Sequence, residues 1–418
     1  MRYTVRGSRA ALALAFYRPR APWPNPGRLL LASRLRMSRL LAPSQSWLFG
    51  RGVDLSVFAG SALVSVALVL AAPWLGAAGD TPPWAWVLLV VCVDVAHVWS
   101  TLFRTYLDPA ALRERPGLYL GAPLVAWLGG VAAYQLSAGA FWTLFAYVAL
   151  FHFVRQQYGW VALYARKARV TALERRLDAA AIYAATVGPV VWWHANLPRR
   201  FWWFVEGDFL PGLPRWVGTL ALALHAGVLV VWGAFQALRV ARGEGLQLGK
   251  VSLVGATWVA WFGGIVLARD DFSFTVMNVV LHGVPYFALL FRYARGRDAE
   301  GRYGVASDIL RAGLPGFLLF LVALAFVEEL LWDRLVWHER AGLFGSVGLQ
   351  LDADVLALVV PLLALPQATH YVLDAFIWKP GREPALLARL GWATRRVEEG
   401  PPSGTSRESV MAIPARNE

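Results

Sequence analysis

Four histidines lie inside long apolar segments of the sequence, and each has polar neighbours at the spacing of a helical turn. They are His97, His152, His282 and His370. An ionisable side chain at membrane depth is costly, so it usually faces the interior of a helix bundle and takes part in function. Four such residues on four separate segments predict a metal site, or at least one shared polar cavity.

Two of these histidines have an aspartate one helical turn away. Asp94 precedes His97 by three residues and Asp374 follows His370 by four, so each pair shares a helix face. A carboxylate in this position can fix the tautomer of a metal-binding imidazole and raise its basicity. Both aspartates are therefore candidate cofactor-supporting residues. The alternative is that each pair is a buried hydrogen bond that only holds helices together.

The segment 152–160 is the most polar stretch inside any apolar run. Arg155, Gln156 and Tyr158 follow His152 there and are the candidate catalytic residues. Arg155 and Gln156 are placed to hold the polar end of a substrate, because a guanidinium pairs well with a carboxylate or a phosphate. The alternative is that Arg155 extends to the membrane surface, as long basic side chains do at helix ends.

Residues that disturb helices surround His282 and His370. Asn278 lies one turn before His282 and is a third candidate cofactor-supporting residue, while Gly283 and Pro285 follow at once. This glycine and proline predict a break that frees backbone carbonyls, which is tolerated at membrane depth where a cavity or protein groups satisfy them. Two prolines before His370 predict a kinked helix in the same way.

The elements that must position these residues are predicted to be membrane-spanning helices. Hydrophobic residues make up 57% of the 418 residues and charged residues only 16%, against about 25% charged in a soluble chain. A span needs about 20 apolar residues, and we therefore predict an all-α fold, a polytopic transmembrane bundle of about ten spans. The candidates are 55–74, 84–103, 118–136, 141–163, 177–193, 216–238, 251–267, 272–293, 314–332 and 355–378.

Basic residues are concentrated in every second connection and at both ends of the chain. The positive-inside rule then places both termini in the cytoplasm, with a bacterial inner membrane as the expected location. It also explains the net charge of +13 without nucleic acid as a partner. Residues 1–50 are predicted to be a basic disordered extension, 51–380 the transmembrane domain, and 381–418 a partly disordered tail. The Trp and Phe clusters of 196–215 predict a segment lying on the outer membrane surface.

The four histidines fall on the second, fourth, eighth and tenth predicted spans, which all cross the membrane in the same direction. At about 1.5 Å per residue from the outer ends they lie roughly 15–23 Å deep, in a hydrocarbon core about 30 Å thick. The single cysteine, Cys92, excludes a disulfide framework and a thiolate zinc cluster. The remaining histidines, His194, His225 and His338, fit structural roles.

Two resemblances follow from these residues. Segments 152–159 and 370–379 resemble those of uncharacterised bacterial multi-pass membrane proteins. The set of four scattered intramembrane histidines is similar in kind to the membrane carotenoid-cleaving dioxygenases of the bacteriorhodopsin-related-protein type, a resemblance that implies iron held by four histidines. The closely spaced histidine boxes of membrane desaturases are absent from the sequence, which disfavours a di-iron desaturase.

Three functions remain open at this point. The first is a membrane oxidoreductase in which the four histidines bind non-haem iron, with haem or zinc as variants, and act on a lipophilic small molecule that arrives from the lipid bilayer. The second is a proton- or ion-coupled transporter that uses the same His and Asp residues. The third is an acyltransferase with His282 as base and Asn278 beside it. The outer halves of spans two, eight and ten are nearly all apolar, which favours an enzyme open from one side.

Overall fold

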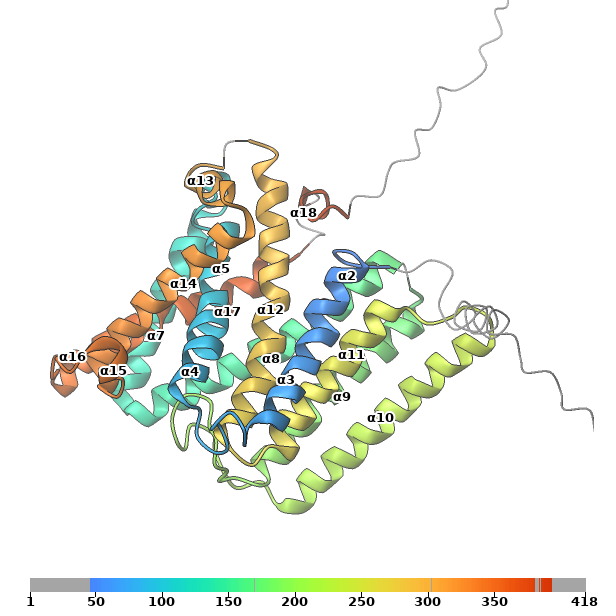
Figure 1. Cartoon of the computed structure of the whole chain (residues 1–418), viewed down its shortest axis with the longest axis horizontal. Coiled ribbons are helices and arrows are strands. Elements are labelled where there is room, and N and C mark those ends of the chain that lie inside the picture. The colour runs from blue at the N-terminus through green and yellow to red at the C-terminus, as the bar shows by residue number, and fades with distance from the viewer. Residues whose placement is uncertain (1–45, 169, 302, 380–382, 384, 393–418) are drawn as a thin grey trace, which may run out of the picture.

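The computed structural model describes residues 46–168, 170–301, 303–379, 383 and 385–392. Every secondary-structure element in this part of the chain is a helix (Figure 1), which confirms the all-α prediction. The predicted N-terminal extension lies outside the described residues except for 46–50, and the predicted C-terminal tail except for 383 and 385–392. The elements are α2 (Arg51–Asp54), η1 (Leu55–Gly60), α3 (Ser61–Ala71), α4 (Pro83–Ala85), η2 (Trp86–Val95), α5 (Ala96–Ser100), η3 (Thr101–Arg104), α6 (Pro109–Glu114), α7 (Pro116–Leu136), α8 (Ala138–Ala168), α9 (Ala172–His194), α10 (Arg215–Ala241), α11 (Leu248–Trp261), η4 (Phe262–Leu267), α12 (Asp271–Asp298), α13 (Val305–Arg311), α14 (Gly313–Trp332), η5 (Asp333–Trp337), α15 (Ala341–Phe344), α16 (Ala353–Leu363), α17 (Leu365–Ile377) and α18 (Ala385–Arg389).

Within the described part of the chain, eight helical segments are long and apolar enough to cross a membrane, and a bent helix pair would make a ninth crossing. They coincide with nine of the ten predicted spans, so a count of ten is not confirmed. The remaining one, α9, is 23 residues long but is not apolar enough to qualify. Its first turns carry Glu174 and Asp178, which are buried and pair with Lys250 of α11 at 2.6 and 2.7 Å. The first turns of α9 are thus held by polar pairing, while its later turns bury apolar residues such as Ile182 and Trp193.

Helix α12 runs through the centre of the bundle (Figure 1). About three-quarters of its apolar stretch is buried (78%), against 11% for α10 at the edge. The helix is continuous through Gly283 and Pro285, so the predicted break at this point is wrong. Gly283 has a packing role instead, because a Cβ atom there would lie 2.7 Å from Val93 Cγ1. A residue without a side chain thus lets α12 approach the segment that carries His97.

The segment that carries His97 is irregular along its whole length. It consists of α4, the π-helical stretch η2, the short helix α5 and the tighter turn η3. Turns of π-helix are frequent at functional sites, because the wider turn displaces the side chains that follow it. Asp94 belongs to the π-helical stretch and His97 to the α-helical turn after it. The change of backbone geometry therefore falls between the two residues of this predicted pair.

Helices α16 and α17 meet at an angle of 42° and together account for the last predicted span. Pro366 occupies the first turn of α17. It has no N–H group to continue the helix before it, and the predicted kink is therefore confirmed. His370 lies one turn further along α17.

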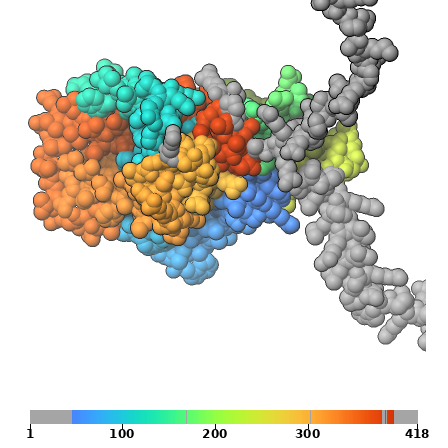
Figure 2. Space-filling model, turned by 90° about the horizontal axis from the view of Figure 1, so that it is seen from above, coloured from blue at the N-terminus to red at the C-terminus, as the bar shows by residue number. Residues whose placement is uncertain are grey.

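The end of α12 is fixed by the short helix α18, which packs beside it (Figure 2). Arg389 of α18 pairs with Glu300 and Glu383, both at 2.7 Å. Arg104, at the end of the His97 segment, pairs with the same Glu383 and donates a hydrogen bond to Tyr293 of α12 at 3.2 Å. This network joins the ends of two helices that carry histidines.

The connection between α9 and α10, which the aromatic residues predict to lie on the outer membrane surface, packs some of these residues inward and leaves others exposed. Phe201 and Phe209 are buried in the main hydrophobic core, and the ring of Trp203 packs against Phe153 at 4.8 Å. The Asp208 carboxylate accepts hydrogen bonds from three backbone N–H groups of this loop, although burial raises its pKa above the usual range. The loop is thus folded into the bundle and covers the side of α8 next to His152.

Candidate metal centre

The four histidines meet in the middle of the bundle. His97 comes from α5, His152 from α8, His282 from α12 and His370 from α17. One nitrogen of each ring lies within 4.8 Å of one nitrogen of every other ring. All four side chains are buried, and the most accessible, His152, is 4% exposed. Helices distant in the sequence therefore bring four imidazoles to one point.

Each of these rings has a buried nitrogen without a hydrogen-bond partner among the described residues. For His97 and His282 this holds for both nitrogens, and for His152 and His370 it holds for Nε2. A buried polar atom left unpaired costs about 1–3 kcal/mol, and native proteins contain few of them. Four in one place are explained if the nitrogens serve as ligands, because a metal supplies the missing partner.

Two histidines outside the cluster differ from these four, because both nitrogens of each ring have a hydrogen-bond partner. His194 pairs through Nδ1 with the Val190 carbonyl at 2.8 Å and through Nε2 with the Tyr147 hydroxyl at 3.0 Å. His225 pairs with the Ala184 carbonyl at 2.6 Å and accepts a hydrogen bond from a tryptophan at 3.1 Å. Both rings are fully satisfied, as expected for structural histidines.

His282 is held by its neighbours on α8. Its ring stacks on Phe153, with ring centroids 3.4 Å apart and an interplanar angle of 7°. Gln156 donates a hydrogen bond from Nε2 to the His282 backbone carbonyl at 3.2 Å. Gln156, predicted to hold a substrate, therefore contacts the backbone of a cluster histidine.

His370 is held by Thr101 rather than directly by Asp374. The Thr101 hydroxyl lies 2.7 Å from His370 Nδ1 and 3.2 Å from the Tyr286 hydroxyl. Tyr286 donates to Asp374 at 2.6 Å, whereas Asp374 is 3.9 Å from His370 Nδ1, beyond hydrogen-bond reach. The aspartate thus acts on the imidazole through a tyrosine and a threonine. Tyr286 was missed in the sequence, although it stands one turn after His282.

Asp94 and Asn278 lie on the other side of the cluster. The Asp94 carboxylate is 3.7 Å from His97 Nδ1 and is one-third exposed, at 34%. Asn278 donates to the Phe274 carbonyl at 2.8 Å, and its Oδ1 has no partner among the described residues. Neither residue makes a hydrogen bond to a cluster ring, and both line the same cavity.

Arg155 and Tyr158 line a second cavity, separate from the one that Asp94 and Asn278 line. Arg155 is exposed, donates to the Tyr183 hydroxyl and places its guanidinium 4.7 Å from the centre of the Tyr158 ring. Tyr158 in turn stacks on Tyr183, with ring centroids 5.1 Å apart. These two candidate catalytic residues face the cavity, together with Gln156.

Two cavities flank the cluster. The first, of about 700 Å³, is lined by Asp94 and Asn278 and by the N-terminal parts of α8 and α12; we call it the acidic cavity. The second, of about 1180 Å³, is lined by His152 and by later residues of the same helices; we call it the basic cavity, because Arg155, Arg166, Arg175 and Lys379 line it. Tyr371 borders both. The prediction of a site open from one side is therefore not supported.

No protein-family profile, curated protein or solved structure matches this chain. The site is consequently interpreted from its own geometry. Imidazole nitrogen suits iron, zinc, copper and nickel. Four buried imidazoles with unpartnered nitrogens, between one acidic and one basic cavity, form a candidate metal centre that either cavity can serve.

Proposed function

We propose that this protein is an integral membrane oxidoreductase in which His97, His152, His282 and His370 bind one non-haem iron. The observation that carries the proposal is the set of unpartnered buried nitrogens on these four rings. Ligands about 2.1 Å from one metal lie at most about 4.2 Å apart. The observed limit of 4.8 Å exceeds this by about 0.6 Å, so the most distant rings would have to close by at least that much.

Iron at this position would supply redox chemistry toward dioxygen. The residues around it hold the ligands in place: Thr101 orients His370, Phe153 packs on the His282 ring, and Gln156 holds the backbone of His282. Four neutral imidazoles carry no charge, so the charge of a divalent ion would be balanced in part by Asp94 and Asp374, which lie just beyond the rings. Zinc or haem remains an alternative occupant.

The basic cavity supports a lipophilic substrate with an anionic end. Apolar side chains such as Leu163, Val187 and Leu289 line its length, and His152 lies at its inner end. Four basic residues gather in the same cavity and suit a carboxylate or phosphate. Phe151, next to His152, also lines it and is 63% exposed. In a bilayer this outward-facing side chain would mark a lateral entrance for a lipid-like molecule.

Metal analysis of the full chain, purified in mild detergent, tests this function. Wild-type protein is expected to carry one iron per chain, with His97→Ala and His370→Ala losing it. His225→Gln is the matched control, because His225 is buried and hydrogen-bonded away from the cluster. Iron content that is low in the wild type and equal in all four proteins would overturn the proposal.

A second candidate is a cation transporter, favoured by the presence of cavities on both sides of the histidines. Proteoliposomes decide between the two. Sustained flux of a divalent cation, lost in His282→Ala, would support transport, whereas one tightly held ion without flux supports the enzyme. An acyltransferase with His282 as base gains less support, since Asn278 binds the Phe274 carbonyl and the other three histidines are left without a role.

A further inference from the structure

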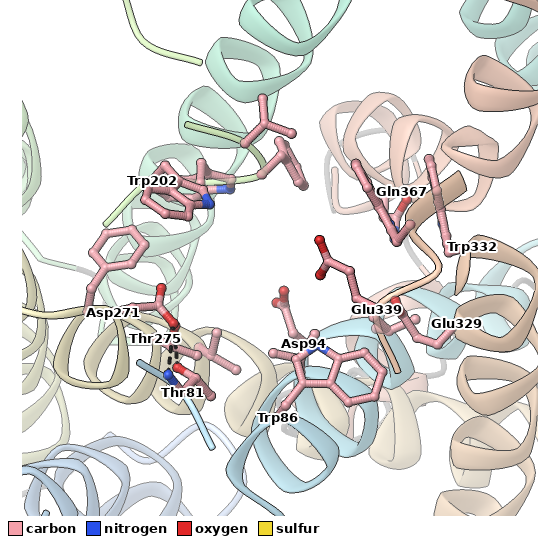
Figure 3. A pocket seen from close by; sticks show the side chains of 18 of the residues that line it. Thr81, Trp86, Asp94, Trp202, Asp271, Thr275, Glu329, Trp332, Glu339 and Gln367 are labelled. Carbon is pink, nitrogen blue, oxygen red and sulfur yellow. Dashed lines mark hydrogen bonds between the residues drawn. The ribbon is translucent and has the colours of Figure 1, made fainter. Parts of the chain in front are cut away.

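The acidic cavity carries a strong excess of negative charge. Among its described lining residues, seven have carboxylates and only Arg340 has a positive charge. Figure 3 shows the carboxylates of Asp94, Glu329 and Glu339 around the open space. We propose that the acidic cavity is the entrance through which a divalent metal cation reaches the four histidines. This inference rests on the proposed metal centre and adds the route by which the centre is filled.

Some of the charged side chains that line the acidic cavity are hydrogen-bonded within its wall, and others face the open space. Asp271 accepts a hydrogen bond from the Thr81 hydroxyl at 2.6 Å, and Asp333 accepts two from backbone N–H groups at 3.0 and 2.8 Å. The guanidinium of Arg340 is held over the Trp86 ring at 3.8 Å. By contrast, the carboxylates of Glu329 and Glu339 have no hydrogen bond or ion pair to any described residue. Arg340 is the one positive charge near them, so the seven lining carboxylates leave a net negative charge, and such an excess in a cleft concentrates cations.

A second feature at the inner end of this cavity also fits a cation. Asn278 lines the cavity, is only 6% exposed, and has an Oδ1 without a partner among the described residues. An amide oxygen is a suitable ligand for a hard divalent ion. Asn278 stands one turn before His282 on α12, so a cation at this oxygen is next to the centre.

Asp94 provides the last step toward the histidines. Its carboxylate lines the acidic cavity and lies 3.7 Å from His97 Nδ1, which has no other partner in the described structure. Carboxylate and amide oxygens hold first-row transition metals more loosely than imidazole nitrogens do. A cation collected by Glu339 and Glu329 would therefore move by way of Asp94 and Asn278 to a tighter site.

The test is the rate at which metal-free protein takes up Co²⁺, followed by the visible absorption of the bound ion after rapid mixing. Glu329→Gln with Glu339→Gln removes two charges from the cavity without touching a histidine. We expect uptake to slow by about tenfold, the lower end of electrostatic steering, and to depend less on salt than uptake by the wild type. The final Co²⁺ content per chain should stay equal to that of the wild type.

Asp354→Asn is the matched control, because Asp354 is exposed on α16 and does not line the cavity. It should load at the wild-type rate. A double variant that loads as fast as the wild type would overturn the inference while leaving the metal centre intact. If the double variant misfolds, the salt dependence of Co²⁺ uptake by the wild type still tests the inference. Uptake by the wild type that does not depend on salt would overturn the proposed entrance. Two results overturn the proposed centre and this route together: a wild-type protein that binds no Co²⁺, or a His97→Ala variant that binds as much Co²⁺ as the wild type.

Discussion

Thr101 contacts the His370 ring, and the spacing of residues along one helix could not predict this contact. The sequence places Asp374 one turn from His370, and the structure leaves that pair 3.9 Å apart while Thr101, from another segment, contacts the ring at 2.7 Å. Contacts between helices carry no signature in a single sequence. The choice of the four histidines rested on their apolar surroundings, their polar neighbours at helical spacing and their matched depth, whereas the residues that orient them depend on how the helices pack.

Thr101→Val tests this support directly. The substitution keeps the shape of the side chain and removes the hydroxyl that contacts both His370 and Tyr286. Metal affinity should fall by about 10–100-fold, the usual effect of losing a residue that holds a ligand. Thr219→Val on α10, where the hydroxyl only contacts its own helix, should leave affinity unchanged. Competition with a chelator of known strength measures both, and equal affinities would refute the role of Thr101.

Asp374→Asn is expected to have a smaller effect than Thr101→Val. The aspartate accepts hydrogen bonds from Tyr286 and Trp378 and reaches His370 only through Tyr286. Tyr286→Phe should therefore weaken metal binding about as much as Asp374→Asn, and combining the two should add little, because both cut one chain of contacts. Additive losses in the double variant would show that the two residues act separately.

At the scale of elements, the apolar runs located the eight described helices, and the bent pair α16 and α17, that are long and apolar enough to cross a membrane, because a spanning helix must be apolar along its length. The tenth predicted span falls on α9, which is less apolar and whose Glu174 and Asp178 are buried and paired with Lys250. The loop before α10 contributes aromatic residues such as Phe201 and Phe209 to the hydrophobic core. The hydropathy of a segment does not show which of its residues are buried by contacts with other helices. The helix break expected at Pro285 was wrong for a related reason, since neighbouring helices stabilise a continuous α12.

Gly283→Ala tests how closely α12 and the His97 segment must approach. The added methyl group would meet Val93 at 2.7 Å from Cγ1 and 3.0 Å from the backbone oxygen. The helices must separate, which should cost about 1–3 kcal/mol and move His282 away from His97, so metal content should fall with the melting temperature. Gly255→Ala on α11 is the control, since nothing lies within 4 Å of its added carbon. That variant should be neutral or slightly more stable, because alanine favours helix.

At the scale of the whole molecule, the opposite charges of the two cavities follow the alternation of basic loops. The basic cavity is lined by Arg166, Arg175 and Lys379, from segments predicted to be cytoplasmic, and the acidic one by Asp80 and Glu339 from the opposite loops. The sequence predicted the basic side from loop charge. It did not reveal the acidic cavity, because the carboxylates come from several loops and helices that meet only in the folded chain.

Reporter fusions test this orientation. A fusion at Ala78 should report the outer side and one at Thr171 the cytoplasmic side, since the basic loops are expected to stay inside. The two positions lie on either end of the bundle, in the connection before α4 and directly before α9. The same side for both fusions would contradict the topology and remove the argument that the two cavities open on opposite faces of a membrane.

X-ray absorption at the metal edge of the purified protein tests the four-histidine centre most directly, because it reports which atoms surround the ion. Loaded with zinc, the protein should show nitrogen ligands at about 2.0–2.1 Å, with the outer-atom scattering of four imidazoles. The His97→Ala protein should show fewer. A first shell dominated by oxygen or sulfur, or a spectrum unchanged by His97→Ala, would contradict the account.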